Sequence, residues 1–239
     1  FVLDTNNGNT LWKNRRDEPT TWATPLIVPI DGKTQLITNG TNAVRSYDLE
    51  TGDIIWETTG TTLNAIPCPV RYQDHVICMG GYQGNDAFSI DLRSQGKIND
   101  SLIGPGQAIQ WRIERHTPYV PSPLVTGDRV YFTKSLNAIL NCYHARSGKP
   151  IFKTDEGYPL PIRLPKLKQM YGSPVATKDF IFLTSREGTT LVIKNSANFE
   201  IISTNSLTEE IDASPAIVGD QIFLRGKRNL YCIENATQK

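Results

Sequence analysis

Short apolar runs alternate with polar turns along the whole chain. The run 130–132 follows the turn Gly127 and Asp128, and the run 222–224 follows the turn Gly219 and Asp220. A two-residue turn of Gly and Asp between apolar runs is a signal of a β-hairpin. After a polar loop, each hairpin is followed by a third β-rich run. These third runs cover 43–47, 87–90, 139–143, 190–193 and 229–233.

A short sequence phrase centred on a proline occurs five times in the chain, once in each predicted hairpin. It is Ala-Thr-Pro-Leu-Ile-Val at 23–28, Pro-Cys-Pro-Val at 67–70, Pro-Ser-Pro-Leu-Val at 121–125, Gly-Ser-Pro-Val-Ala at 172–176 and Ala-Ser-Pro-Ala-Ile-Val at 213–218. The central prolines are Pro25, Pro69, Pro123, Pro174 and Pro215, with spacings of 44, 54, 51 and 41 residues. Self-similarity at such a period indicates a repeat architecture.

A second phrase closes most of the repeats. It is Asp-x-x-x-Gly-x-x-x-Trp at 4–12 and 48–56, with a degraded copy at 144–152 and an equivalent aromatic residue after an insertion at about 94–107. Asp and Gly favour the turn, because Asp bonds its own backbone and Gly accepts a positive φ. We predict that the closing aromatic residues begin the outermost strands and pack between neighbouring repeats as structural residues. They are Trp12, Trp56, Trp111 and Phe152.

Each repeat therefore contains four short antiparallel strands, which is the pattern of a β-propeller blade. A single four-stranded sheet cannot bury both faces, so neighbouring blades must stack. We predict an all-β propeller with about five and a half blades in this chain, and a ring of about seven or eight blades in the parent protein. A β-solenoid or a β-sandwich is a weaker alternative, because solenoid coils are shorter and a sandwich does not repeat both phrases in step.

We predict one incomplete propeller domain over 1–239. Blade ends occupy 1–18, and blades occupy about 19–60, 61–116, 117–156, 170–206 and 210–239. The first blade lacks its two inner strands and the last lacks its outer strand, for a total of 21 strands. We expect an upstream segment to be absent from this chain.

Composition narrows the function classes. Lys and Arg number 25 against 24 Asp and Glu, and this balance argues against a surface that binds nucleic acid. No apolar run approaches the roughly 20 residues that span a bilayer. The four cysteines lie in no Cys-x-x-Cys pair. We expect buried free thiols, although Cys68 and Cys78 flank a predicted hairpin and a disulfide between them stays open.

Candidate catalytic chemistry is sparse. His75, His116 and His144 are scattered, and we expect each to be a surface or turn residue and not a base or a metal ligand. No sequence pattern of a serine hydrolase, a zinc protease or a phosphate-binding loop is present. We therefore predict no catalytic residue and no metal ligand in this chain.

The two phrases resemble the PQQ-like repeat of quinoprotein alcohol dehydrogenases and of the outer-membrane assembly factor BamB. Stretches 119–132 and 213–233 are most similar to the BamB-like repeat proteins of Planctomycetes and Verrucomicrobia. The resemblance covers nearly the whole chain and implies a propeller fold, a location in the periplasm or cell envelope and a protein partner. It does not settle activity, because function resides in sites grafted on folds.

The resemblance offers two functions. In the dehydrogenases it implies PQQ stacked on a Trp, a vicinal disulfide, a Ca²⁺ ion held by Glu and Asn, and an Asp base. This chain has no adjacent cysteines and no matching ligand set. We therefore predict a non-catalytic scaffold for protein–protein interaction without a cofactor, and keep a PQQ- and calcium-dependent dehydrogenase fragment as the alternative.

The predicted binding surface is the end of the blades where the connections between blades meet the loops between second and third strands. The connection at about 155–170 is long, stiffened by proline and basic. We hypothesise that this end binds a partner protein or an anionic ligand, and a sugar- or peptide-binding module is a third possibility. The candidate residues are Tyr82, Asn85, Tyr158, Arg163, Lys166, Lys168, Arg186, Arg225, Lys227 and Arg228.

Overall fold

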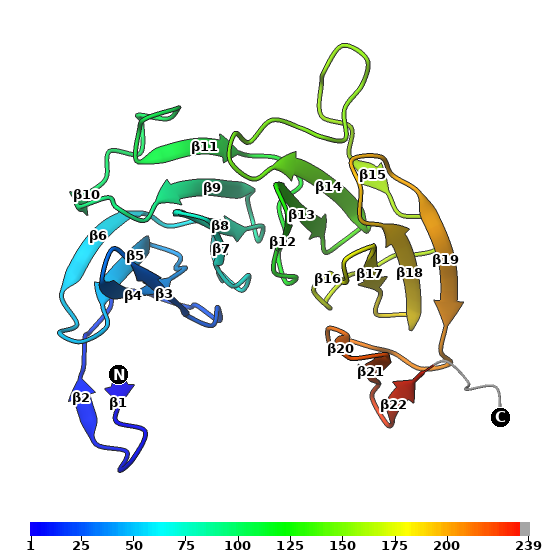
Figure 1. Cartoon of the computed structure of the whole chain (residues 1–239), viewed down its shortest axis with the longest axis horizontal. Helices are drawn as coiled ribbons and strands as arrows, with labels where there is room; N and C mark the ends of the chain where they lie inside the picture. Colours follow the sequence, from blue (N-terminus) through cyan, green and yellow to red (C-terminus); the bar gives the residue numbers. More distant parts are fainter. Residues whose placement is uncertain (235–239) are drawn as a thin grey trace. The chain divides into compact units, whose positions relative to one another are not determined.

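A computed structural model describes residues 1–234 of the chain, all strands and turns without a helix in that range. Its 22 strands fall into two compact units (Figure 1). The first unit comprises 1–117 with 145–148, and the second comprises 118–144 with 149–239. The last predicted blade runs to 239, so its final five residues lie outside the described range.

The first unit holds a two-stranded, a five-stranded and a four-stranded sheet. Their orders are β1-β2, β10-β6-β5-β4-β3 and β11-β9-β8-β7, and every pairing except that of β10 is antiparallel. The strands are β1 (Val2–Leu3), β2 (Thr10–Trp12), β3 (Leu26–Ile30), β4 (Lys33–Thr38), β5 (Ala43–Asp48), β6 (Ile54–Thr59), β7 (Val70–Tyr72), β8 (His75–Gly80), β9 (Asp86–Asp91), β10 (Gly96–Lys97) and β11 (Ile109–Ile113).

The second unit holds two four-stranded sheets and one three-stranded sheet, all antiparallel. Their orders are β12-β13-β14-β15, β16-β17-β18-β19 and β20-β21-β22. The strands are β12 (Leu124–Thr126), β13 (Arg129–Lys134), β14 (Ile139–His144), β15 (Ile162–Arg163), β16 (Val175–Ala176), β17 (Phe180–Thr184), β18 (Thr189–Lys194), β19 (Ile201–Ser206), β20 (Ala216–Val218), β21 (Gln221–Arg225) and β22 (Leu230–Ile233).

The predicted all-β architecture of four-stranded antiparallel sheets is confirmed. The proline phrases lead into the first strand of each sheet, and the predicted third runs coincide with β5, β9, β14, β18 and β22. The second and third strands of the four-stranded sheets are largely buried on both faces, as in β8, where all six residues are buried, whereas β22 of the last sheet is mostly exposed. Strands in that position need apolar side chains on both faces because neighbouring sheets cover them. The ring of seven or eight blades stays a prediction.

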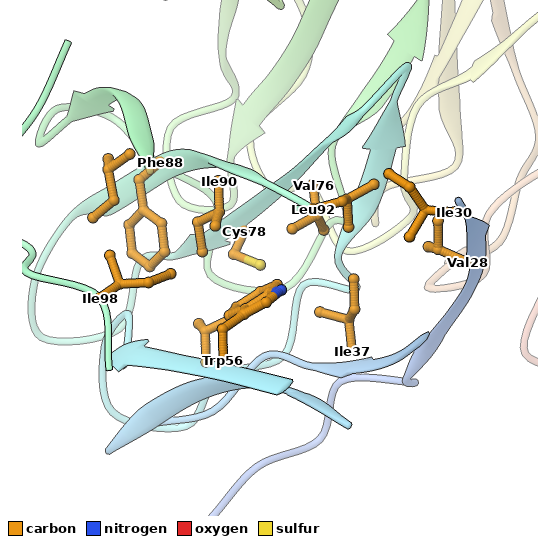
Figure 2. Close-up of a cluster of buried hydrophobic side chains, with 12 residues drawn as sticks. Val28, Ile30, Ile37, Trp56, Val76, Cys78, Phe88, Ile90, Leu92 and Ile98 are labelled. Carbon is orange, nitrogen blue, oxygen red and sulfur yellow. The ribbon is translucent and has the colours of Figure 1, made fainter. Parts of the chain in front are cut away.

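Neighbouring sheets within each unit share an apolar core. In the first unit the Trp56 ring is fully buried among side chains of its own sheet and of the next sheet, including Cys78, Phe88 and Ile90 (Figure 2). In the second unit the corresponding cluster joins β13 and β14 to β17 and β18 around Leu140. Burial of each large apolar side chain stabilises the fold by about 1.5–3 kcal/mol, so stacking of sheets supplies the stability that one sheet lacks.

A backbone carbonyl also joins consecutive sheets at four places. It belongs to the residue that follows the third strand of a sheet, and it accepts a hydrogen bond from a side chain of the preceding sheet. The pairs are Trp12 Nε1 to Leu49 O at 2.8 Å, Gln35 Nε2 to Leu92 O at 2.8 Å, Trp111 Nε1 to Ala145 O at 2.8 Å and the Arg129 guanidinium to Asn195 O at 3.2 Å. Three residue types thus satisfy one recurring backbone acceptor, which is buried at Leu92 and Ala145 and part-buried at Leu49 and Asn195.

Two strands differ from the prediction. The insertion at 94–107 is not only a loop, because its residues 96–97 form β10, which pairs in parallel with Trp56 and Glu57 of β6. The fourth strand of the third predicted blade does not begin at Phe152, as predicted, but is β15 at 162–163. Pro150, Pro159 and Pro161 lack the N–H that a continuous ladder needs, so the chain leaves the sheet before it returns.

The structure also tests the predictions made for His75 and for the four cysteines. His75 directly follows the turn 73–74, but the expected surface position is wrong: its side chain is buried at the start of β8, and Nδ1 lies 2.8 Å from a carboxylate oxygen of Asp74. None of the four cysteines, all of which lie in the described range, forms a disulfide. Burial raises the pKa of the Cys142 thiol to about 12, so this thiol stays protonated at neutral pH and acts as a small apolar residue.

Candidate functional site

The candidate site lies at one end of the sheets in the second unit, where connections meet the loops between second and third strands. Three backbone hydrogen bonds tie the connection 164–170 to the loop 135–138. They run from Leu164 N to Ala138 O at 2.9 Å, from Asn137 N to Lys168 O at 3.0 Å and from Met170 N to Ser135 O at 2.8 Å. A loop held by its backbone in this way presents its side chains in a fixed arrangement.

Buried apolar residues anchor the same connection from below. Leu164, Leu167 and Met170 are each at most 4% exposed and belong to the core of the second unit. Arg163 directly precedes the first anchor, Lys166 and Lys168 lie between the anchors, and all three are exposed. The spacing of the anchors therefore directs three cationic side chains outward.

The loop 135–138 places an apolar side chain beside these cations. Leu136 is 56% exposed, although its backbone is bridged to Gln169 of the connection. Asn137 and Ala138 have φ values of 82° and 47°, a left-handed conformation that non-glycine residues rarely adopt. Strain of this kind concentrates at functional sites. We call Leu136 with Arg163, Lys166 and Lys168 the basic platform.

The platform cations have no side-chain ion pair within the described residues, although the Glu187 carboxylate accepts a hydrogen bond from the Lys168 backbone N–H at 3.4 Å. No acidic side chain of residues 1–234 forms an ion pair with Arg163, Lys166 or Lys168. Lys134 ends β13, and Arg163 ends β15. Both lie opposite Ile139, the first residue of β14, which is the strand between them. A surface with three or four unpaired cations around an exposed leucine suits an anionic surface that carries an apolar side chain.

The other predicted basic residues belong to different local networks. The Arg186 guanidinium is hydrogen-bonded to both carboxylate oxygens of Asp212, at 2.5 and 3.2 Å, and it lies 4.0 Å from the centre of the Tyr171 ring. Lys227 forms an ion pair with Glu210. Arg186 and Lys227 are thus already paired with carboxylates of the protein. Arg225 and Arg228 are exposed and have no ion pair with a described residue.

A carboxylate organises the loop that carries Arg228. Glu209 accepts hydrogen bonds from the Arg228 backbone N–H at 2.8 Å and from the Asn229 amide at 2.9 Å. Hydrogen bonds from the Tyr231 hydroxyl, Asn229 and the Arg228 backbone lower the pKa of Glu209 to about 2. Glu209 thus fixes the loop 226–229 against the connection 207–215.

The remaining predicted residues lie elsewhere. Tyr158 is 70% exposed in the excursion between β14 and β15, which extends away from the sheet (Figure 1). Asn85 in the first unit is a structural residue, because its Oδ1 accepts a hydrogen bond from Thr117 N at 3.2 Å. Tyr82 is half-buried there, with Leu63 bridged to it. The structure therefore brings only three of the predicted residues together on the platform.

Sequence reasoning missed Leu136 and Lys134. Both lie next to a predicted apolar run, and Leu136 has the composition of a core residue, so no polar signal marked it. The left-handed turn that exposes it gives no glycine signal either, because Asn137 and Ala138 supply it. The sequence Lys-Ser-Leu-Asn-Ala at 134–138 contains Asn as the one hint of a turn.

The dehydrogenase alternative implies a calcium site and a vicinal disulfide. Over 1–234, no group of three or more His, Cys, Asp or Glu side chains is arranged to hold a metal ion. No two cysteines are adjacent in the sequence, so the vicinal disulfide implied by the dehydrogenases has no counterpart in this chain. The same range contains no helix with the length and apolar character to cross a membrane.

Four-stranded sheets in tandem, entered by a proline phrase and mostly closed by an aromatic residue, define a β-propeller of quinoprotein-type repeats. A family model described as outer membrane protein assembly factor BamB matches residues 1–154, and the chain belongs to this family. A search of curated proteins finds no match.

Solved structures share the fold. The crystal structure of BamB from Moraxella catarrhalis superposes with a TM-score of 0.69 at 15% sequence identity, over 96% of this chain and 64% of that protein. The computationally designed Ika8 protein superposes with a TM-score of 0.60 at 12% identity, over 87% of this chain and 57% of that protein. This chain thus spans about two thirds of the length of the BamB structure.

Proposed function

We propose that this protein is a non-catalytic scaffold that binds a protein partner through the basic platform, in the bacterial cell envelope. One observation carries the proposal: three unpaired cations and an exposed leucine are held on a connection that is anchored by its backbone and by buried side chains. Membership in a family described as an outer membrane protein assembly factor supports a role in that process.

The platform chemistry favours a partner segment with Asp or Glu side chains around one apolar residue. Arg163 can bind a carboxylate through two parallel hydrogen bonds, and Lys166 and Lys168 act as point charges. Burial of Leu136 in the complex would add apolar contact at the centre of the interface. Because the platform is pre-organised, binding costs little loop-ordering entropy.

Charge reversal tests the platform. The test places a photo-crosslinking probe at position 136 and measures crosslinks to the partner protein in intact cell envelopes. A variant with R163E, K166E and K168E should reduce the yield of these crosslinks by about ten-fold or more, because three attractive contacts become repulsive. The matched control is K33E, K97E and K178E, which reverses three exposed lysines away from the platform. Equal crosslinking by both triple variants would exclude the platform as the binding surface.

A cellular measurement tests the assembly role. Removal of the protein should lower the content of folded outer membrane proteins, and the wild-type protein and the control variant should restore it. The platform variant should not restore it although it folds. Restoration by the platform variant would separate the assembly role from the platform.

The alternative of sugar binding lacks a supporting arrangement. Its two aromatic residues, Tyr82 and Tyr158, belong to different compact units. A glycan array remains the measurement that would revive it.

A further inference from the structure

One tryptophan has no part in the closing phrases. The side chain of Trp22 is 70% exposed, whereas Trp56 and Trp111 are 0% and 5% exposed and Trp12 donates a hydrogen bond to the next sheet. The backbone of Trp22 is nevertheless held firmly. Its N–H donates to Ala65 O at 2.9 Å, and the preceding residue forms a parallel bridge with the same alanine. A large aromatic side chain is therefore exposed to solvent on a backbone that is held in place.

The chain contains a second aromatic residue at the equivalent position of another repeat. Trp22 lies three residues before the phrase proline Pro25, and Tyr171 lies three residues before Pro174. The Tyr171 ring is covered by the Arg186 guanidinium, 4.0 Å from the ring centre. This repeat shows which group an aromatic ring at this position accepts.

The first repeat lacks the corresponding cation. Gly40 occupies the position of Arg186, because each is the second residue of the four-residue loop between the second and third strands. Their carbonyls also accept equivalent hydrogen bonds, from Thr61 N to Gly40 O at 3.1 Å and from Ile211 N to Arg186 O at 3.1 Å. Glycine has no side chain that could cover the Trp22 ring.

The carboxylate that holds the cation is replaced as well. Asp212, which binds Arg186, lies three residues before Pro215, and its equivalent before Pro69 is Ile66. Among the described residues, no cation lies over the Trp22 ring.

We propose that Trp22 binds an arginine side chain of a partner protein. Tryptophan is the strongest cation–π acceptor, and the weakly hydrated guanidinium stacks on aromatic faces more readily than an ammonium group. A rigid exposed tryptophan is also the residue type that most often dominates binding at protein interfaces. This site lies in the first unit and does not depend on the basic platform, which prefers acidic groups.

A peptide titration tests the site. The probe is the acetylated peptide Gly-Arg-Gly-Arg-Gly, compared with its lysine counterpart, and the readout is the tryptophan fluorescence of the full chain. We expect a saturable change with the arginine peptide and an affinity roughly three-fold higher than that of the lysine peptide. Trp22 should dominate this change, because it is 70% exposed, whereas Trp56 and Trp111 are buried and Trp12 is part-buried in contact with the next sheet.

Three variants decide the assignment. W22A should lose binding of the arginine peptide in isothermal titration calorimetry, which does not depend on indole fluorescence, and because the side chain is exposed this variant should keep its melting temperature. R186A should bind a second arginine peptide in the same measurement, because it uncovers the Tyr171 ring, whereas R225A, which leaves Arg186 in place, should bind only one.

No saturable response in the wild-type protein, equal affinity for the two peptides or a response that persists in W22A would each overturn the proposal. A response to an oligosaccharide in place of the arginine peptide would also overturn it, in favour of a sugar site.

Discussion

At the scale of single residues, the closing tryptophans show how one ring serves two purposes. Trp111 packs against the turn of the next sheet, where a Cβ atom on Gly148 would lie 2.5 Å from the indole, and its Nε1 bonds Ala145 O. Trp56 fills the core completely, but its Nε1 has no partner among the described residues. In this repeat the carbonyl equivalent to those that Trp12 and Trp111 bind is that of Leu92, and it accepts its hydrogen bond from the Gln35 side chain.

This difference predicts unequal costs for the same substitution. W111F removes a hydrogen bond and leaves the Ala145 carbonyl without it, so it should destabilise the protein by about 1 kcal/mol more than W56F. The measurement is the free energy of unfolding from urea denaturation of both variants. An equal or smaller cost for W111F would show that the hydrogen bond contributes nothing.

The close approach of Trp111 predicts a second effect. Gly148 and Gly127 have similar φ values, 63° and 55°, but nothing lies within 4 Å of a Cβ atom at Gly127. Both substitutions to alanine incur the cost of the left-handed conformation. G148A should cost a further ~1–3 kcal/mol, since the indole must move, and comparison of the two denaturation curves isolates this part.

At the scale of elements, connections and loops form fixed pairs. The connection 207–215 holds the loop 226–229 through Glu209, as 164–170 holds 135–138. Side-chain hydrogen bonds stabilise the ionised Glu209, which lowers its folded-state pKa to about 2 from an ordinary value of 4.5. The stability from this group is present above the ordinary pKa and is lost as pH falls toward 2.

A carboxyl titration followed by NMR tests this element. The Glu209 resonance should titrate near pH 2, and Y231F should raise its pKa toward 4.5, because the Tyr231 hydroxyl makes the largest contribution. E209Q should remove the corresponding loss of stability between pH 4.5 and 2. A midpoint near 4.5 in the wild-type protein would refute the hydrogen-bond network.

Element boundaries were predictable where the periodic phrases are intact. The phrases predicted the first three strands of every complete sheet, because turn chemistry and apolar runs act locally. They failed at β15 and β10. The placement of β15 depends on the prolines of the preceding excursion, and β10 exists only because the insertion reaches the edge of β6.

At the scale of the whole molecule, family membership fixes the repeat class and leaves the chemistry open. The chain aligns with 64% of the BamB structure, so activity and partners of the complete protein are proposals. The described residues include both the site that we assign to an acidic partner segment and the exposed Trp22. These two surfaces differ in charge preference, so separate variants can test them.

Cofactor addition gives a test at this scale. A ligand that binds only the native state raises the melting temperature by mass action. Since we expect no cofactor, we predict that PQQ with Ca²⁺ leaves the melting temperature of this protein unchanged. Differential scanning calorimetry with and without both ligands measures this. A rise that requires both ligands would favour the dehydrogenase alternative over the scaffold.

The sequence by itself determined the repeat, the strand pattern and the family, because hairpin turns and closing phrases are local and recur in step. Of the binding residues that it proposed, Arg163, Lys166 and Lys168 form the candidate platform and stay a prediction, whereas Arg186 and Lys227 are engaged in ion pairs within the protein. Only the tertiary structure decided which cations stay unpaired, that Leu136 stands among them and that Trp22 lacks the arginine that covers Tyr171. Those facts depend on contacts between residues far apart in the chain, which a local pattern does not encode.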